Sequence, residues 1–276
     1  MDFENVLILI QKELRDALRN RWFLLYAVAF AALSLALAWF SASGAGSYGV
    51  AGFGRTTAGL INLILLIVPL MGLTLGALAL AGEREKGTLI YLLAQPVSGG
   101  ELLLGKFIGL ALALTAALVI GFGLTGVLMA FAGGGGDFVI YLTLLALSVL
   151  LGIASLSLGF LISAAVRRAA TAVGLALFLW LALVYFGDLG LMGTAVVLQL
   201  DIQQLLALAL VNPLQVFKIA AVLDLRDNLE VLGPAGIYAF RTYGAALWPL
   251  LVGLLLAWVV APFALAARVF KKRGVL

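Results

Sequence analysis

The chain contains no cysteine and no histidine among its 276 residues. Without cysteine it can form neither a disulfide nor a thiolate metal site. Without histidine it lacks the commonest metal ligand and the commonest general base. Only 11% of its residues are charged, against about 25% in a typical soluble domain. We therefore predict that the chain is not an enzyme, with no catalytic residue and no metal site of its own.

Apolar residues, by contrast, make up 64% of the chain, and its mean hydropathy is +1.20. No soluble core could bury so much apolar surface, so we expect lipid to be the surrounding solvent. Backbone polar groups must be satisfied within each segment in lipid, which favours helices. Six apolar runs approach or exceed the roughly 20 residues that a helix needs to cross a bilayer: residues 22–40, 60–82, 103–131, 138–164, 169–187 and 246–268. The predicted fold is all-α, a single transmembrane domain over residues 1–276 with six transmembrane helices.

Lysine and arginine are distributed unevenly among the segments that join these runs. If both termini lie in the cytoplasm, 13 of the 17 basic residues fall on the cytoplasmic side, as the positive-inside rule requires. They are Lys12, Arg15, Arg19, Arg21, Arg84, Lys86, Lys106, Arg167, Arg168, Arg268, Lys271, Lys272 and Arg273. The net charge of +4 is explained by this bias, so we expect membrane lipid and no nucleic acid as a partner. A cleaved signal peptide over residues 1–43 is the disfavoured alternative, because 21 residues precede its long apolar run.

Residues 1–21 have the pattern of an amphipathic helix. Apolar residues recur at steps of three and four, while charged residues occupy the other face. The apolar set is Phe3, Val6, Leu7, Ile10, Leu14 and Leu18, and the charged set is Lys12, Glu13, Arg15, Asp16 and Arg19. Because an apolar run follows at once, we predict an elbow helix lying on the inner leaflet. A helix packed on a soluble partner is the alternative.

Residues 188–245 form a long segment between the last two runs, on the side opposite the termini. It is too charged to be a seventh span, yet it contains a helix-length apolar stretch that Asn212-Pro213 should break, and a second short helix is predicted over 214–223. Gly233-Pro234 marks a further turn. The apolar content favours helices at the outer interface or against a partner over a mobile loop. We predict contact with a partner on that outer side through Asn212, Pro213, Leu214, Phe217 and Lys218.

Charged and apolar residues follow one another over residues 83–100, directly after the second run. The segment reads Glu83-Arg84-Glu85-Lys86-Gly87-Thr88-Leu89, then Leu92-Leu93, Pro96 and Ser98. The leucines would share one face of a short helix, which Pro96 would end. Ser98 and Glu101 have the spacing of a capping box that opens the third span. We predict a rigid, water-exposed helix-turn-helix element on the cytoplasmic side, for which a plain solvated charge cluster is the alternative.

This segment, followed by Gly105-Lys106, resembles the signature of the ABC-2 type permease family. The elbow helix, the six spans and the outer helices fit the same family, so the resemblance covers essentially the whole chain. It implies that residues 83–100 form a coupling helix that docks on a separate ATP-binding subunit. The implied contacts are Glu83, Arg84, Glu85, Lys86, Gly87, Thr88, Leu89, Leu92 and Pro96. It also implies a homodimer with two ATPase subunits in the bacterial inner membrane, where ATP and Mg belong to those subunits and this chain holds no cofactor.

Within that family, the chain is similar to permeases of complexes that mature the copper site of nitrous oxide reductase in the denitrifying periplasm. The similarity rests on length, the elbow, Glu83–Pro96 and Asn212–Lys218. It implies a copper-handling periplasmic partner, to which the permease transmits ATP-driven movement or a small exported species. A generic exporter of hydrophobic drug- or lipid-like substrates is the alternative, and a membrane protein without energy coupling is a third reading.

Few side chains within the spans can bind or transfer ions. No Asp, Glu, Lys or Arg falls well inside a predicted span, which disfavours a proton- or ion-driven transporter. Among soft copper ligands, only Met71 and Met129 lie in spans, and we interpret both as core packing. Gly72-x-x-x-Gly76 and Gly105-x-x-x-Gly109 are predicted to allow close helix contacts.

Overall fold

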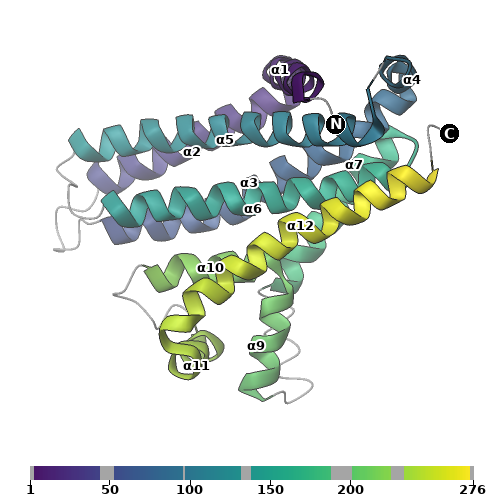
Figure 1. Cartoon of the computed structure of the whole chain (residues 1–276). Coiled ribbons are helices and arrows are strands. Elements are labelled where there is room, and N and C mark those ends of the chain that lie inside the picture. The colour runs from purple at the N-terminus through teal and green to yellow at the C-terminus, as the bar shows by residue number, and fades with distance from the viewer. Residues whose placement is uncertain are drawn as a thin grey trace.

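The computed structural model describes residues 3–43, 53–95, 97–131, 138–187, 201–224 and 233–273. All regular secondary structure in these ranges is helical, which confirms the predicted fold class (Figure 1). The helices are α1 (Phe3–Arg19), α2 (Arg21–Ser43), α3 (Phe53–Glu85), α4 (Thr88–Leu93), α5 (Gly99–Phe131), α6 (Phe138–Ala165), α7 (Ala169–Tyr185), α9 (Ile202–Val211), α10 (Pro213–Asp224), α11 (Gly233–Tyr243), the 3₁₀ turn η3 (Gly244–Ala246) and α12 (Leu247–Arg273).

Five of the six predicted spans correspond to helices long and apolar enough to cross a bilayer, namely α2, α3, α5, α6 and α12. The remaining one is shorter than expected, because α7 has 17 residues. At 1.5 Å per residue it is about 26 Å long, less than the ~30 Å hydrocarbon core. Helices α9 and α10 together would also be long enough, but the chain bends by 109° between them. The described residues thus contain five candidate spans, or six if this bent pair is one.

Helix α3 lies at the centre of the bundle. In α3, 67% of the most apolar stretch is buried, whereas the corresponding share is 22% in α2 and 22% in α12. It packs most closely on α6, where glycine allows backbone contact: a Cβ on Gly72 would lie 2.5 Å from the carbonyl oxygen of Gly152. A Cβ on Gly76 would overlap the carbonyl of Leu156. The close contact predicted from the spacing of these two glycines is therefore confirmed.

Several chain segments gather at one end of the bundle, which we call the α4 end. Figure 1 shows α1, α4 and the C-terminal end of α12 there. Helices α2, α3, α5 and α6 run across that view, whereas α1 is seen end-on, so α1 lies across the bundle axis. Helix α1 is therefore a separate N-terminal helix, and its role as an elbow helix on the inner leaflet stays a prediction.

The helices between α7 and α12 break where the sequence predicts. Helix α9 ends at Val211, and Pro213 opens α10. Asn212 holds the corner: its Nδ2 donates to the carbonyl of Leu183 at 2.7 Å, and its Oδ1 accepts from the backbone N–H of Leu214 at 3.0 Å. The turn predicted at Gly233-Pro234 is instead the start of α11, because proline suits the first turn of a helix.

Candidate functional site

The 83–100 segment forms the predicted helix-turn-helix at the α4 end. Helix α3 ends at Glu85, the chain turns through Gly87 at φ 73°, and α4 follows. That φ lies in the left-handed region, which favours glycine. The capping box is also present: the N–H of Ser98 donates to Oε2 of Glu101 at 2.9 Å, and the N–H of Glu101 donates to Oγ of Ser98 at 3.3 Å. Pro96 lies outside the described residues.

A buried ion cluster joins Glu83 to two other helices. Nζ of Lys106 in α5 lies 2.7 Å from Oε1 of Glu83 and 2.6 Å from Oε1 of Glu13 in α1. The Lys106 side chain is 1% exposed. Lys12 adds a second cation, 3.0 Å from Glu13 and 3.5 Å from Glu83. Charges taken out of water are tolerated when they are paired in this way, so the cluster fixes α1, α3 and α5 to one another.

Two expectations about this cluster are wrong. The sequence predicts Glu13 on the charged face of α1, opposite its apolar face, but Glu13 is buried, because α1 packs on α5 along Leu9, Glu13 and Ala17. The count of cytoplasmic basic residues places Lys106 with the segments that join the spans, but α5 already begins at Gly99. The lysine therefore lies inside the helix and is buried, at its α4 end.

The pKa of Lys12 responds to the same cluster. Burial alone would lower the pKa of its ammonium group, but the charges of Glu13 and Glu83 and hydrogen bonds to Glu13 and Asp16 outweigh burial. The net result is a pKa raised well above the ordinary 10.5. Lys12 therefore remains a cation throughout the neutral range.

The contact between α1 and α5 depends on two glycines. A Cβ on Gly105 would lie 2.5 Å from Cβ of Leu9, and a Cβ on Gly109 would lie 2.7 Å from Cβ of Glu13. The Gly105-x-x-x-Gly109 spacing thus permits close helix packing as predicted. Its partner is the N-terminal helix α1.

Arg84 binds the end of α6. Its Nη1 donates to the carbonyl oxygen of Val166 at 2.7 Å and to that of Ser163 at 3.4 Å. Helix α6 ends at Ala165, so the guanidinium satisfies carbonyls that the helix itself leaves without a partner. A cation at a helix C-terminus also interacts favourably with the helix dipole.

Glu85 binds the start of the next helix. Its Oε2 accepts a hydrogen bond from the backbone N–H of Ala169, the first residue of α7, at 2.6 Å. A carboxylate at a helix N-terminus is favourable for the same electrostatic reason. Glu83, Arg84 and Glu85 therefore bind α5 with α1, α6 and α7 in turn, so these three predicted ATPase contacts make internal bonds.

The water-facing part of the segment lies on α4. Leu89 is fully buried and Leu92 is half-buried, so they attach α4 to the bundle. Ile90 and Tyr91 are 61% and 76% exposed. Sequence reasoning missed these two residues, although they lie between the leucines that defined the buried face of the short helix. Of the predicted contacts, Glu85, Lys86 and Thr88 are exposed and Gly87 is half-buried.

Ser163 of α6 is inserted into the backbone of α3 just before this segment. Its Oγ accepts from the N–H groups of Leu80 and Ala81 at 2.9 and 2.8 Å, and donates to the carbonyl of Ala77 at 2.7 Å. The hydroxyl adds these bonds from outside a helix that is continuous from Phe53 to Glu85. Helix α3 is therefore held by α6 within one turn of Glu83.

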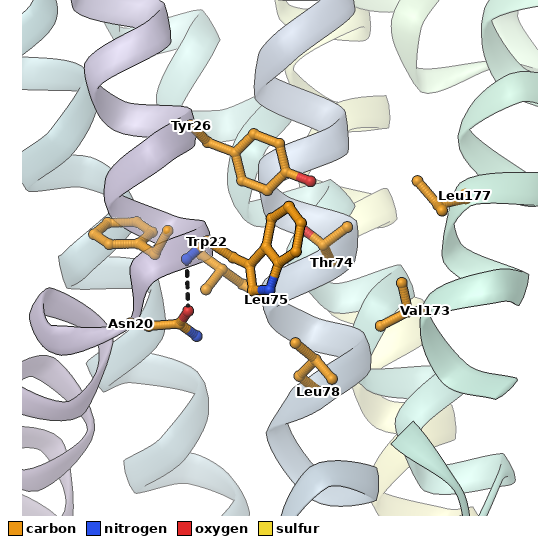
Figure 2. A pocket seen from close by; sticks show the side chains of 9 residues that line it. Asn20, Trp22, Tyr26, Thr74, Leu75, Leu78, Val173 and Leu177 are labelled. Atoms are coloured by element: carbon orange, nitrogen blue, oxygen red, sulfur yellow. Dashed lines mark hydrogen bonds between the residues drawn. The ribbon is translucent and has the colours of Figure 1, made fainter. Parts of the chain in front are cut away.

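A cavity of about 170 Å³ lies between α2, α3 and α7. Figure 2 shows Trp22 and Tyr26 pointing from α2 toward Thr74 of α3, with Val173 and Leu177 of α7 on the far side. Asn20, which joins α1 to α2, also lines the cavity. Most of the lining is apolar, so the cavity suits an apolar group.

The predicted periplasmic contact residues occupy two kinds of position. Pro213, Leu214 and Phe217 are buried, and α10 packs on α6 and α12. Asn212 and Lys218 are half-buried. In this conformation the three apolar residues form core packing that holds α10 in the bundle. Contact of the segment with a partner stays a prediction.

The described ranges contain no group of three or more His, Cys, Asp or Glu side chains that could hold a metal ion. Met71 and Met129 are buried in the main apolar core. Met71 lies in α3 and Met129 in α5, and their burial agrees with their interpretation as packing residues.

Comparison with known proteins gives a family and two relatives. A model of the family described as "ABC-2 family transporter protein" matches residues 7–275. The chain is 33% identical over 270 residues to "Probable ABC transporter permease protein NosY" of Stutzerimonas stutzeri, covering 95% of this chain and 96% of that protein. It is 34% identical over 281 residues to a protein of the same name from Pseudomonas aeruginosa, with coverage of 96% and 97%.

Proposed function

Because the chain belongs to the ABC-2 family of transporter proteins, we propose that it is the permease of a complex that matures the copper site of nitrous oxide reductase. Its relatives are named as permease subunits, and in such transporters ATP hydrolysis lies in partner subunits. In our proposal, two ATPase subunits like NosF drive a homodimer of this chain. The dimer passes their movement, or a small exported species, to a periplasmic copper-handling protein like NosD.

One observation supports the coupling role: some residues of the 83–100 segment bond to the bundle, whereas others face outward. Its charged residues Glu83, Arg84 and Glu85 bind four helices of the bundle, whereas Ile90 and Tyr91 are exposed on its outer face. An exposed apolar pair on a water-facing helix suits a protein partner, and the internal bonds would carry a movement of α4 into the bundle. We assign Ile90 and Tyr91, with Lys86 and Thr88, as the ATPase-docking residues.

The proposed orientation places the α4 end in the cytoplasm of a bacterial inner membrane. The excess of basic residues on that side supports it. Phe3, Leu7 and Leu18 of α1 are exposed apolar residues, which suit insertion of the elbow helix into the inner leaflet. Helices α9, α10 and α11 would then contribute to the periplasmic surface.

A homodimer is supported by the outward face of α7. Leu175, Phe178 and Leu181 are exposed there. A second copy of the chain would cover this apolar face.

The cavity between α2, α3 and α7 favours a second candidate function, export of a small apolar molecule. Its walls include Trp22, Tyr26 and Leu177, and such lining suits apolar ligands. In this alternative the permease would work without a periplasmic protein, and the exported molecule would stimulate ATP hydrolysis.

The two functions are separated by reconstituting the chain with its ATPase subunit and nitrous oxide reductase. We expect ATP-dependent assembly of the copper site only when the periplasmic protein is present. The double variant I90S/Y91S should lose the ATPase subunit on purification while keeping the parent's melting temperature. Q95A, a change at an exposed residue of the same segment, is the matched control. Substrate-stimulated ATP hydrolysis without the periplasmic protein would favour the exporter, and a chain that binds no ATPase would refute both.

A further inference from the structure

We propose that Lys106 is a positioning residue that joins the elbow helix α1 to the 83–100 segment, so that both move as one body. The biological role of this link rests on the proposed ATP coupling, but its physical existence does not. The link would carry a displacement of the segment to α1 and from there into α2.

The geometry of Lys106 is that of a bridge between separate elements. Its ammonium group lies 2.6 Å from Glu13 and 2.7 Å from Glu83, which are 93 and 23 residues away in the chain. Glu13 belongs to α1 and Glu83 to the end of α3. Loss of this cation would leave the two carboxylates with the part-exposed Lys12 as their remaining cation, at the longer distances of 3.0 and 3.5 Å. Removal of one partner from a buried ion cluster is strongly unfavourable, so Lys106 holds Glu13 and Glu83 close to each other.

The neighbouring glycines make this bridge short. Gly105 and Gly109 remove the side chains that would keep α1 away from α5, so the Glu13 carboxylate reaches Lys106 directly. The two roles explain why glycine and lysine are adjacent at positions 105 and 106. Gly105 admits the backbone of α1, and Lys106 binds its carboxylate.

The link continues from α1 into the cavity wall. Helix α1 ends at Arg19 and α2 begins at Arg21, so Asn20 alone separates them. Oδ1 of Asn20 accepts from the backbone N–H of Trp22 at 3.0 Å, which fixes the start of α2 to this junction. Asn20 and Trp22 both line the cavity between α2, α3 and α7 (Figure 2). A displacement of α1 would therefore shift one wall of that cavity.

The absence of cysteine from the chain permits a direct test. Spin labels on Q11C in α1 and T88C in α4, both at exposed positions, would be the only two in the chain. Their distance distribution is measured in lipid nanodiscs without nucleotide. We expect the distribution to become at least twofold broader in K106M and to stay unchanged in K271M, a matched loss of an exposed lysine.

Folding is controlled with a second variant, E13Q/E83Q/K106M, in which the buried cation and both of its carboxylate partners are neutral and the part-exposed Lys12 is the one charge left at the cluster. It should fold like the parent and still give the broad distribution. Unchanged distributions in both K106M and the neutral triple variant would overturn the proposal. In the complete complex, the triple variant should keep ATP hydrolysis but lose at least tenfold in copper sites assembled per ATP. Equal yields per ATP with a broadened distribution would overturn the mechanical role of the link and leave the docking of the ATPase intact.

Discussion

Oε2 of Glu85 lies 2.6 Å from the backbone nitrogen of Ala169, although 84 residues separate them in the chain. The first N–H groups of a helix have no partner within the helix, and Glu85 supplies one to α7. The turn between α6 and α7 is thereby bound to the end of α3. Arg84 binds the carbonyl of Val166 at the start of the same turn, so adjacent charges of opposite sign satisfy opposite helix ends.

Replacement of Glu85 by alanine should loosen the start of α7. Loss of a side-chain acceptor at a helix N-terminus costs about 1 kcal/mol, so E85A should lower the melting temperature of the purified chain. E85Q keeps an oxygen that can accept the bond from Ala169 and should lose less than half as much. Equal melting temperatures for E85A and the parent would show that the bond does not stabilise the chain.

Replacement of Ser163 by alanine should have a larger effect. The hydroxyl bonds the N–H groups of Leu80 and Ala81 and the carbonyl of Ala77, and each such intramolecular hydrogen bond contributes about 0.5–1.5 kcal/mol. We expect S163A to destabilise the chain by about 2 kcal/mol or more.

The control for this change is S148A. Ser148 is equally buried in α6, but its hydroxyl bonds only Leu144 of its own helix. That carbonyl keeps its helical position after the change, so the cost should be at most about 1 kcal/mol. Thermal unfolding monitored by size-exclusion chromatography compares the two variants. A loss in S148A as large as that in S163A would contradict the special role of the α3–α6 contact.

Local signals predicted much of this fold correctly. The apolar runs located five spans, Asn212-Pro213 located a helix break, and Ser98 with Glu101 located the start of α5. In each case the determining interaction lies within a few residues of the chain. The apolar run at 169–187 likewise located α7 (Ala169–Tyr185).

The partners of the charged segment could not be predicted in the same way. Glu83, Arg84 and Glu85 bind residues 23, 82 and 84 positions away, and an alternation of charges is equally compatible with water. Hydropathy also treats a lipid-facing leucine and a core leucine alike. The pattern alone therefore could not show that Leu214 is buried against the bundle, and its contact with a partner stays a prediction. The partners of the charged residues and the burial of Leu214 both depend on how distant helices pack, which a local sequence pattern does not show.

Gly109 and Gly123 allow a matched test of the contact between α1 and α5, because both lie within α5. An added Cβ at Gly109 would meet Cβ of Glu13 at 2.7 Å, whereas at Gly123 it would meet nothing within 4 Å. Overpacking costs about 1–3 kcal/mol, so G109A should displace α1. G123A should be neutral or more stable by about 0.5–1 kcal/mol.

The displacement can be followed with a single cysteine. Ala17 on the packed face of α1 is 3% exposed, so A17C should react slowly with a thiol reagent in the parent chain. We expect faster labelling in the G109A background and unchanged labelling in the G123A background. Faster labelling in both backgrounds would show that α1 leaves α5 for reasons unrelated to Gly109.

Met71 and Met129 test whether copper itself passes through the described part of the permease. Both thioethers are buried among apolar side chains, and an exchange of methionine for leucine conserves volume at a cost usually below about 1.5 kcal/mol. If the two residues only fill the core, M71L/M129L should support copper-site assembly in nitrous oxide reductase at the parent's rate. Leucine offers no soft ligand for Cu(I), so a relay through these sulfurs would fail in the variant. A loss of assembly with normal complex formation and normal ATP hydrolysis would therefore contradict the mechanical role and place copper within the membrane domain.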